Sequence, residues 1–463
     1  MNTLPPFSRR RFLQGTSSGF GYLAFSALST WASSPLAPKP SHFAARAKRV
    51  IFLFMPGAPS HVDTFDYKPK LTADSGKESG RGRGGPATLL GSPWRFTQHG
   101  RSGLWISELF PEVAKHADRL CLMRSMHTDL PNHPQAVIQM HTGTAQFIRP
   151  SLGSWALYGL GTTNENLPGF ITINPAGQGG ARNFGSAFLP AIYQGTRIGS
   201  GFPRAAVARR GGASSTQTIN NIANPRYTPE VQRTQLDFIQ TLNKAKLQQE
   251  VYEPQIEGVI ESGELAFRMQ NVAPQVMDLE KESAATKSLY GIGETGTDAF
   301  GRQCLMARRL AEAGVRFIEL SAGNWDQHRN LTADLERNCS SIDKPIAGLL
   351  TDLESRGLLK DTLVMWGGEF GRTPHAQSGD GRDHNNKGFT LWMAGGGVKG
   401  GLSYGATDDY GYEAVSDKVH IHDWHATILA LLGLDHEKLT YRYAGRDFRL
   451  TDVSGNVVKE IFA

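Results

Sequence analysis

Short, unbroken apolar segments alternate with helix-periodic segments along most of this 463-residue chain. The first of them, Val50–Met55 (VIFLFM), has no polar position at all, which is typical of a strand buried on both faces. Similar segments predict strands at residues 119–126, 170–173, 315–320, 362–366 and 389–394. Helical periodicity between them predicts helices at residues 108–118, 136–140, 299–313, 341–356 and 425–432. This alternation predicts an α/β fold with a central, mostly parallel or mixed sheet sandwiched by helices.

Residues 228–290 differ from the rest, because Gln, Glu and Lys dominate a helix-periodic pattern there. We expect two or three helices in this stretch, inserted on the outside of the domain.

The net charge of +6 is too diffuse for a nucleic-acid surface, so no nucleic-acid partner is expected. The three cysteines are too few and too scattered for a disulfide framework or a zinc knuckle.

The N-terminal segment has the order of elements found in a twin-arginine export signal. Residues 8–13 read SRRRFL, and a mildly apolar run rich in Gly and Ser follows to about residue 32. That run is too short and too polar to span a membrane. We therefore expect residues 1–45 to be a signal peptide and linker, residues 46–463 to form one domain, and the protein to reach the periplasm or cell surface.

Carboxylates and imidazoles follow the expected strands or open the expected helices. Since the carboxyl ends of parallel strands share one edge of a sheet, these side chains are expected to converge. Carboxylate and imidazole ligands suit Zn²⁺, Mn²⁺ or Fe²⁺, whereas Mg²⁺ or Ca²⁺ is favoured if oxygens dominate. Arg372 could hold a phosphate or sulfate oxygen beside such a metal. The candidate residues are Asp63, Asp66, His133, Asp326, His328, Glu369, Asp383 and His384.

A purely structural interpretation exists for each of these residues taken alone. Asp326 and His328 could form a turn in which the carboxylate caps the backbone, and Asp383 could do the same next to His384. His422 and His425 are best explained as residues that cap and solvate the start of a helix, at least in one case. The set of Asp326, Glu369 and His384 taken together favours a functional site.

Several long motifs resemble the twin-arginine-exported proteins that contain the domain of unknown function 1501. The resemblance covers nearly the whole chain after the signal, including the Gly-rich segment at residues 395–401. The motifs are Pro56–Asp66 (PGAPSHVDTFD), Phe188–Pro190 (FLP), Tyr193–Thr196 (YQGT), Ala307–Leu310 (ARRL), Gly314–Phe317 (GVRF), Trp325–His328 (WDQH), Gly368–Pro374 (GEFGRTP) and Gly381–His384 (GRDH).

That family looks like a branch of the alkaline phosphatase and sulfatase superfamily, which implies an alkaline-phosphatase-like mixed sheet with metals at the strand ends. The resemblance places the superfamily's first-strand aspartate near Met55, so that this ligand is missing here or is replaced by Asp63 or Asp66. It places His133 where the superfamily has its nucleophile, and the Cys-x-Pro-x-Arg motif of sulfatases is absent. Glu369 keeps a carboxylate where an Asp-His pair is expected, and His384 matches the third metal histidine.

These observations lead to two hypotheses. In the first, the protein is an exported metal-dependent hydrolase of phosphate or sulfate esters, acting on an anionic small molecule or polysaccharide. Asp63, Asp326, His328, Glu369 and His384 would then hold a divalent metal (Zn, Mn, Ca or Mg), with His133 and Arg372 as catalytic residues. In the second, it is a non-catalytic sulfatase-like surface protein that binds anionic polysaccharide or a secreted partner. The sequence does not determine the oligomeric state.

Overall fold

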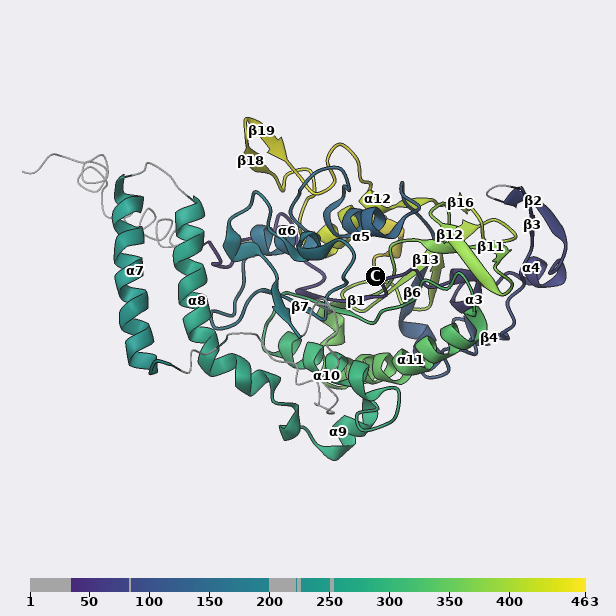
Figure 1. Ribbon diagram of the computed structural model, residues 1–463, viewed down its shortest axis with the longest axis horizontal. Helices are drawn as coiled ribbons and strands as arrows, with labels where there is room; N and C mark the ends of the chain where they lie inside the picture. Colours follow the sequence, from purple (N-terminus) through teal and green to yellow (C-terminus); the bar gives the residue numbers. More distant parts are fainter. Residues whose placement is uncertain (1–34, 83–84, 200–221, 223–225, 250–253) are drawn as a thin grey trace, which may run out of the picture.

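The structure is a computed structural model that describes residues 35–82, 85–199, 222, 226–249 and 254–463 (Figure 1). The twin-arginine pattern at residues 8–13 lies outside these residues, so export remains a prediction. Among the described residues, no helix combines the length and the apolar character needed to cross a bilayer.

A nine-stranded mixed sheet forms the centre of the described part of the chain. Eight strands follow the order β14-β6-β13-β10-β1-β9-β7-β8, and β17 pairs with β6. Only β13 runs antiparallel to its neighbours β10 and β6, so the other strands point the same way. The strands are β1 (Arg49–Phe54), β6 (Leu120–His127), β7 (Phe170–Ile173), β8 (Thr196–Ile198), β9 (Phe317–Ser321), β10 (Thr362–Gly367), β13 (Phe389–Ala394), β14 (Leu402–Tyr404) and β17 (Val419–His420).

Strand β1 shows why this sheet needs helices on both faces. Its side chains alternate between two separate hydrophobic clusters: Phe52 belongs to one, and Ile51 and Leu53 belong to the other. Each fully buried side chain of this kind contributes about 1.5–3 kcal/mol relative to an exposed one. The predicted α/β fold with a mixed sheet between helical layers is therefore confirmed.

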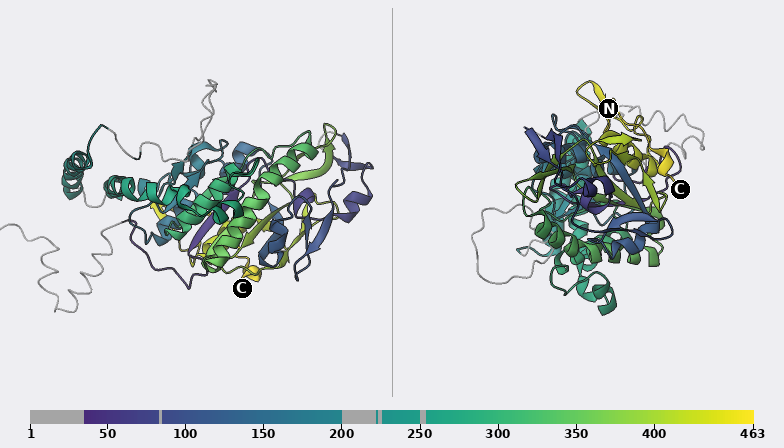
Figure 2. Two further views of the ribbon diagram at one scale, coloured as in Figure 1. Left: turned by 90° about the horizontal axis from the view of Figure 1, so that it is seen from below. Right: turned by 90° about the vertical axis from the view of Figure 1, so that its right-hand side faces the viewer.

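Two groups of helices provide these layers (Figures 1 and 2). Helix α8 (Pro254–Met277) contributes to both hydrophobic clusters, through Leu265 and Met269 to the one around Phe52 and through Ala273 to the one around Ile51. Besides α8, the cluster around Phe52 contains residues of three α-helices, and the cluster around Ile51 contains residues of two others. The first three are α5 (His133–Thr142), α6 (Leu152–Leu160) and α12 (Ile421–Leu431), and the other two are α10 (Asp298–Glu312) and α11 (Leu331–Ser355).

Two helix predictions need correction. Residues 108–118 were expected to be an α-helix, but only a 3₁₀ helix, Val113–Arg119, forms there. Pro111 has no amide hydrogen for a helical bond, and the Asp343 carboxylate accepts the amides of Glu112 and Val113 instead. Helix α11 begins ten residues before the predicted position 341, because its first turns bury only a sparse apolar stripe.

The segment after β10 was expected to be a loop, and this prediction was wrong. Residues 371–385 form an antiparallel hairpin of β11 (Gly371–Gln377) and β12 (Gly381–Asn385). Ser378 and Gly379 adopt positive φ angles of 51° and 96°, which allow the tight connection. The hairpin lacks apolar alternation because its buried side chains include Arg372 and Arg382, so the sequence gives no strand signal.

The described residues between 229 and 289 are mostly helical, as the composition indicated. Helices α7 (Pro229–Gln249) and α8 (Pro254–Met277) lie side by side at one end of the molecule, away from the sheet, and α9 (Ala284–Leu289) follows (Figures 1 and 2).

The remaining strands form small hairpins: β2 (Glu78–Gly82) with β3 (Gly85–Thr88), β4 (Phe96–His99) with β5 (Leu104–Ser107), β15 (Ala406–Thr407) with β16 (Ala414–Ser416), and β18 (Tyr441–Tyr443) with β19 (Arg446–Phe448). The three cysteines are free and buried.

Candidate metal centre

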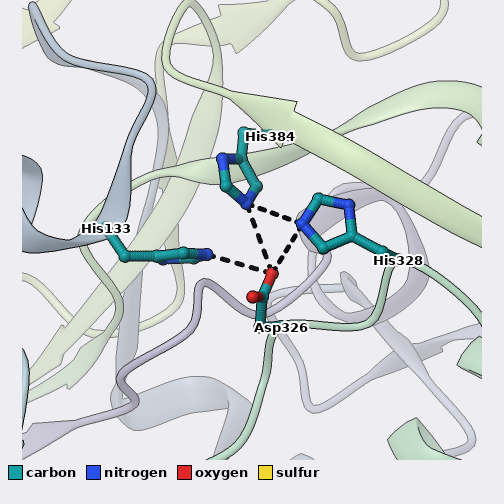
Figure 3. Close-up of side chains that lie close together, drawn as sticks. All are labelled: His133, Asp326, His328 and His384. Carbon is teal, nitrogen blue, oxygen red and sulfur yellow. Dashed lines mark hydrogen bonds and ion pairs between the residues drawn. The ribbon is translucent and has the colours of Figure 1, made fainter.

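Four side chains from distant parts of the sequence meet at the carboxyl edge of the sheet (Figure 3). His133 opens α5 after β6, and Asp326 and His328 follow β9. His384 comes from β12 of the hairpin that follows β10. The expectation that groups after different strands would converge is thus met for these four residues, whose donor atoms all lie within 4.8 Å of one another.

One carboxylate oxygen stands at the centre of the cluster. Oδ1 of Asp326 lies 3.0 Å from Nε2 of His133, 2.9 Å from Nε2 of His328 and 3.3 Å from Nε2 of His384. The Nε2 atoms of His328 and His384 are 2.9 Å apart. In a tetrahedral zinc site with bonds of 2.0–2.1 Å, neighbouring donors are about 3.4 Å apart. The cluster therefore needs only small movements to surround a cation.

The outer nitrogen of each imidazole is held by a separate acceptor. For His133 and His384 the partner is a carboxylate or a backbone carbonyl, which can only accept a hydrogen bond, so these contacts place a hydrogen on Nδ1 and leave Nε2 available to a metal. Outer acceptors of this kind orient histidine ligands in metal sites. The contacts are His133 Nδ1 to Glu369 Oε1 (2.5 Å), His328 Nδ1 to Gln377 Oε1 (2.5 Å) and His384 Nδ1 to the Pro131 carbonyl (2.7 Å).

Glu369 lies behind His133 rather than among the four converging donors. Its side chain is fully buried, and its carboxylate also accepts the Gly57 amide at 3.0 Å. Gly57 has a φ of +107°, and a Cβ there would stand 2.7 Å from the backbone nitrogen of Trp325. The PGAP turn after β1 thus needs glycine to bring its amide to Glu369.

Arg372 lies behind Asp326 in the same way. It is fully buried, and it donates to Oδ1 of Asp326 at 2.7 Å. Its other donors are used by the backbone carbonyls of Gly57, Ala58, Trp325 and Arg382. Burial lowers the pKa of Arg372, and Asp326 partly offsets this effect. The guanidinium that was expected to bind an anion therefore points at protein acceptors, where it fixes the position of Asp326.

Asp63 is also outside the cluster. Its two carboxylate oxygens accept Nε and Nη2 of Arg382 at 2.7 and 3.0 Å, and both side chains are fully buried. Arg382 precedes His384 by two residues on β12, so this pair ties the loop after β1 to the hairpin that carries His384. Asp66 is likewise buried, 3.2 Å from Lys68. In the structure both carboxylates anchor the loop after β1.

The electrostatics of the cluster favour a cation. Burial disfavours the charged form of His133, but Asp326 and Glu369 more than offset it and raise the pKa of His133. Burial also opposes ionisation of Asp326, yet His133, His384 and Arg372 lower the pKa of Asp326 far below its ordinary value. Asp326 is therefore ionised at any physiological pH. A metal ion would compete with a proton for Nε2 of His133.

The cluster is sealed on one side and open on the other. The side chains of Asp326 and His328 are 36% and 34% exposed, whereas His133 is 8% exposed. A ligand can thus approach from the side of Asp326 and His328. Sequence reasoning missed Gln377 and the Pro131 carbonyl, and no sequence signal marks either as an outer partner.

The other candidate histidines lie outside this centre. The side chain of His420 caps α12 by accepting the amide of His422, and Asp423 completes a capping box. His425 is fully buried, with Nε2 2.7 Å from the Met140 carbonyl. Burial lowers the pKa of His425 to about 3, so this imidazole is neutral. The prediction that His422 or His425 caps and solvates the start of this helix is therefore wrong: His420 is the cap, and His425 is buried inside the protein.

No curated protein sequence matches this chain. Solved structures similar to it include the PsFucS1 sulfatase from Pseudoalteromonas sp., at 12% identity and a TM-score of 0.35, covering 85% of this chain and 69% of that one. A protein in the alkaline phosphatase superfamily from Vibrio parahaemolyticus has 10% identity and a TM-score of 0.35, covering 87% and 70% of the two chains. TAB5 alkaline phosphatase with Mg bound has 11% identity and a TM-score of 0.34, covering 78% and 94%.

The sequence comparison covers almost all of the described structure. A family model matches from Ala47, just before β1, to Phe462, the penultimate residue. The matched region contains every residue of the metal cluster and its outer acceptors. The chain therefore belongs to the family described as "Protein of unknown function (DUF1501)", whose model matches residues 47–462.

Proposed function

We propose that this protein is an exported, metal-dependent hydrolase of phosphate or sulfate esters. The observation that carries the proposal is the convergence of three Nε2 atoms and one Asp326 oxygen, with each outer nitrogen held by an acceptor. Such an arrangement orients the imidazole nitrogens toward one point, as the outer partners of histidine ligands do in metal sites.

The donor set narrows the choice of metal. Three imidazole nitrogens and one carboxylate suit Zn²⁺, Mn²⁺ or Fe²⁺ better than Mg²⁺ or Ca²⁺, which prefer oxygen ligands. A bound ion of this kind supplies Lewis acidity, which polarises an ester and acidifies water. Asp326, His328, His384 and His133 would hold it.

The chain's own residues define what the site can do around that ion. Both nitrogens of His133 are engaged, one by Glu369 and one by Asp326, so His133 serves as an oriented ligand rather than as a nucleophile. Arg372 holds Asp326 in place from behind. The substrate's anionic ester approaches from the open side of Asp326 and His328.

Metal content and hydrolysis of the full-length protein test this proposal. We expect about one transition-metal ion per chain by elemental analysis, and loss of that metal in His384→Ala and Asp326→Asn. The matched control is His99→Ala, because His99 lies in the β4–β5 hairpin outside the metal cluster, where its imidazole bonds the Thr97 hydroxyl. Metal-loaded wild type should hydrolyse an aryl phosphate or an aryl sulfate. A metal-free wild type without either activity rules the proposal out.

One observation favours the second candidate, a non-catalytic binding protein. All four donors come from the protein, and closed four-ligand sites are typical of structural metals, whereas catalytic sites keep a position open. A protein that binds the metal tightly but hydrolyses neither ester, and whose thermal unfolding temperature falls on chelation, would support this candidate. The exposure of Asp326 and His328 favours the hydrolase.

Export is the remaining part of the proposal. It is supported by the SRRRFL pattern at residues 8–13. We expect the wild type in the periplasmic or surface fraction of a bacterial host with a twin-arginine system. The double variant Arg9→Lys, Arg10→Lys should stay in the cytosolic fraction, and equal fractionation of the two would refute export by this route.

A further inference from the structure

A polar pocket lies next to the metal centre. It has a volume of about 470 Å³, and its walls are α5, the loops before and after α5, the start of α12 and the segment after β19. Arg149 lies in the loop after α5. Asp129 and Leu130 line it, and the next residue, Pro131, holds His384 through its carbonyl. One short loop therefore forms part of the pocket wall and part of the metal centre.

Most charges that line this pocket are already paired. The Asp129 carboxylate is bonded to Gln139 and lies 3.3 Å from His420. Asp452 pairs with Arg446, and Arg449 lies 3.3 Å from Glu437. Each of these charged groups therefore already has a polar or ionic partner within the protein.

Arg149 is the exception. Among the described residues it forms no ion pair with a carboxylate, and its only hydrogen bond is a 3.4 Å contact to the Ile148 carbonyl. Its guanidinium stands over three aromatic rings, with centroid distances of 4.3 Å to Phe448, 4.9 Å to Phe147 and 5.9 Å to Phe188. Stacking of this kind holds the planar group in place while its N–H donors stay free.

We infer that Arg149 binds an anionic group of the substrate in this pocket, on a part of the substrate other than the ester at the metal centre. This inference rests on the proposed function, because it places the reacting ester at the His/Asp cluster. A stacked guanidinium without a carboxylate partner is suited to hold a sulfate, phosphate or carboxylate through two parallel hydrogen bonds.

The rest of the pocket indicates what carries that anionic group. Its volume is in the range of small-ligand sites. Gln135, Thr144 and Ser454 offer neutral polar groups at the wall, and Phe147 adds a 56% exposed ring at the rim. Amide and hydroxyl groups beside an aromatic ring suit a sugar ring with several hydroxyls. The substrate class is therefore an anionic polysaccharide rather than a small monoester.

Calorimetric binding of a dextran sulfate oligosaccharide to the full chain tests this inference. We expect Arg149→Gln to weaken binding about 10-fold or more, because a charge-assisted bidentate contact is lost. Arg149→Lys should retain part of the affinity. The control is Arg442→Gln, since Arg442 is exposed on β18 and pairs with Asp447 outside the pocket. Uncharged dextran should not bind, and inorganic sulfate should compete with dextran sulfate in the wild type.

The outcomes separate this inference from the proposed function. Binding needs no turnover, so Arg149-dependent binding in a protein that hydrolyses nothing supports the pocket and rejects the hydrolase. Wild-type affinity in Arg149→Gln, an equal loss in Arg442→Gln, or a failure of inorganic sulfate to compete would each overturn the inference. Preference for polyphosphate over dextran sulfate would also overturn the assignment to a polysaccharide.

Discussion

Replacing Glu369 with glutamine removes one negative charge from the back of the metal centre and changes little else. Both donors, Nδ1 of His133 at 2.5 Å and the Gly57 amide at 3.0 Å, approach the same carboxylate oxygen, Oε1. A glutamine oxygen in that position can accept both bonds, and the side-chain volume is kept. The weaker contact of the Gly57 amide with Oε2, at 3.3 Å, is lost because a glutamine NH₂ there cannot accept it. The substitution therefore isolates the charge of an outer-sphere carboxylate from its shape.

The expected effect is a 10- to 100-fold loss of metal affinity, or about 1.4–2.7 kcal/mol, as for outer partners of histidine ligands in general. The loss should be smaller at low pH. Glu369 helps to raise the pKa of His133, so the substitution also lowers the affinity of His133 for the proton that competes with the metal. Above the pKa of His133 no proton competes with the metal in either protein, so the full loss of metal affinity should be measured.

Competition with a chelating dye, using Zn²⁺ at several pH values, measures this affinity. The control is Glu354→Gln, which removes a half-exposed carboxylate that pairs with Arg119 at 2.6 Å on the surface. Circular dichroism should show that both variants stay folded. Zinc affinity of Glu369→Gln within twofold of the wild type at high pH, or a penalty that grows as the pH falls, would refute the reasoning.

Three further predictions concern packing and buried charge. Gly381→Ala places a Cβ 2.0 Å from the His328 carbonyl, so we expect it to cost about 1–3 kcal/mol or more by urea unfolding and to weaken zinc binding. Burial raises the pKa of Asp343 from 3.8 to about 6. As the pH rises from 4 to 6, the free energy of unfolding of the wild type, measured relative to Asp343→Asn, should therefore fall by up to about 3 kcal/mol. Burial disfavours charge on His141, but Glu319 at 3.2 Å offsets this and raises the pKa of His141. Glu319→Gln should therefore cost about 3–5 kcal/mol below pH 6.5, and less as the pH rises through that pKa; a pH-independent cost would contradict this.

The sheet was predictable because its signals are local. Residues 170–173 and 389–394 form strands with the predicted boundaries. Strand β1 is shifted by one residue at both ends from its predicted range, and β10 is one residue longer than predicted. Each is a continuous apolar run, and such a run is buried on both faces wherever it lies in the sheet. The β11–β12 hairpin was missed because its buried side chains are guanidiniums and imidazoles, which carry no apolar periodicity.

The site was predictable only as a set of residues. The rule that polar groups after parallel strands share an edge was enough to bring Asp326, His328 and His384 together with His133. The same rule could not assign the role of Glu369, which lies behind the cluster. Nor could it show that Arg372 faces backbone carbonyls and Asp326, because that depends on how the loop after β1 folds over it.

The sequence by itself determined the α/β alternation, the edge of the sheet at which chemistry-bearing residues gather, and the family. These follow from side-chain periodicity and motifs that act over a few residues. Only the tertiary structure decided which side chains point their donor atoms into the metal cluster and which, like Glu369 and Arg372, hold those side chains in place from outside it. Asp63 and Arg382 are 319 positions apart, yet their buried ion pair takes Asp63 away from the cluster. Ligand geometry is set by ångström-scale contacts between such distant segments, and no local pattern records them.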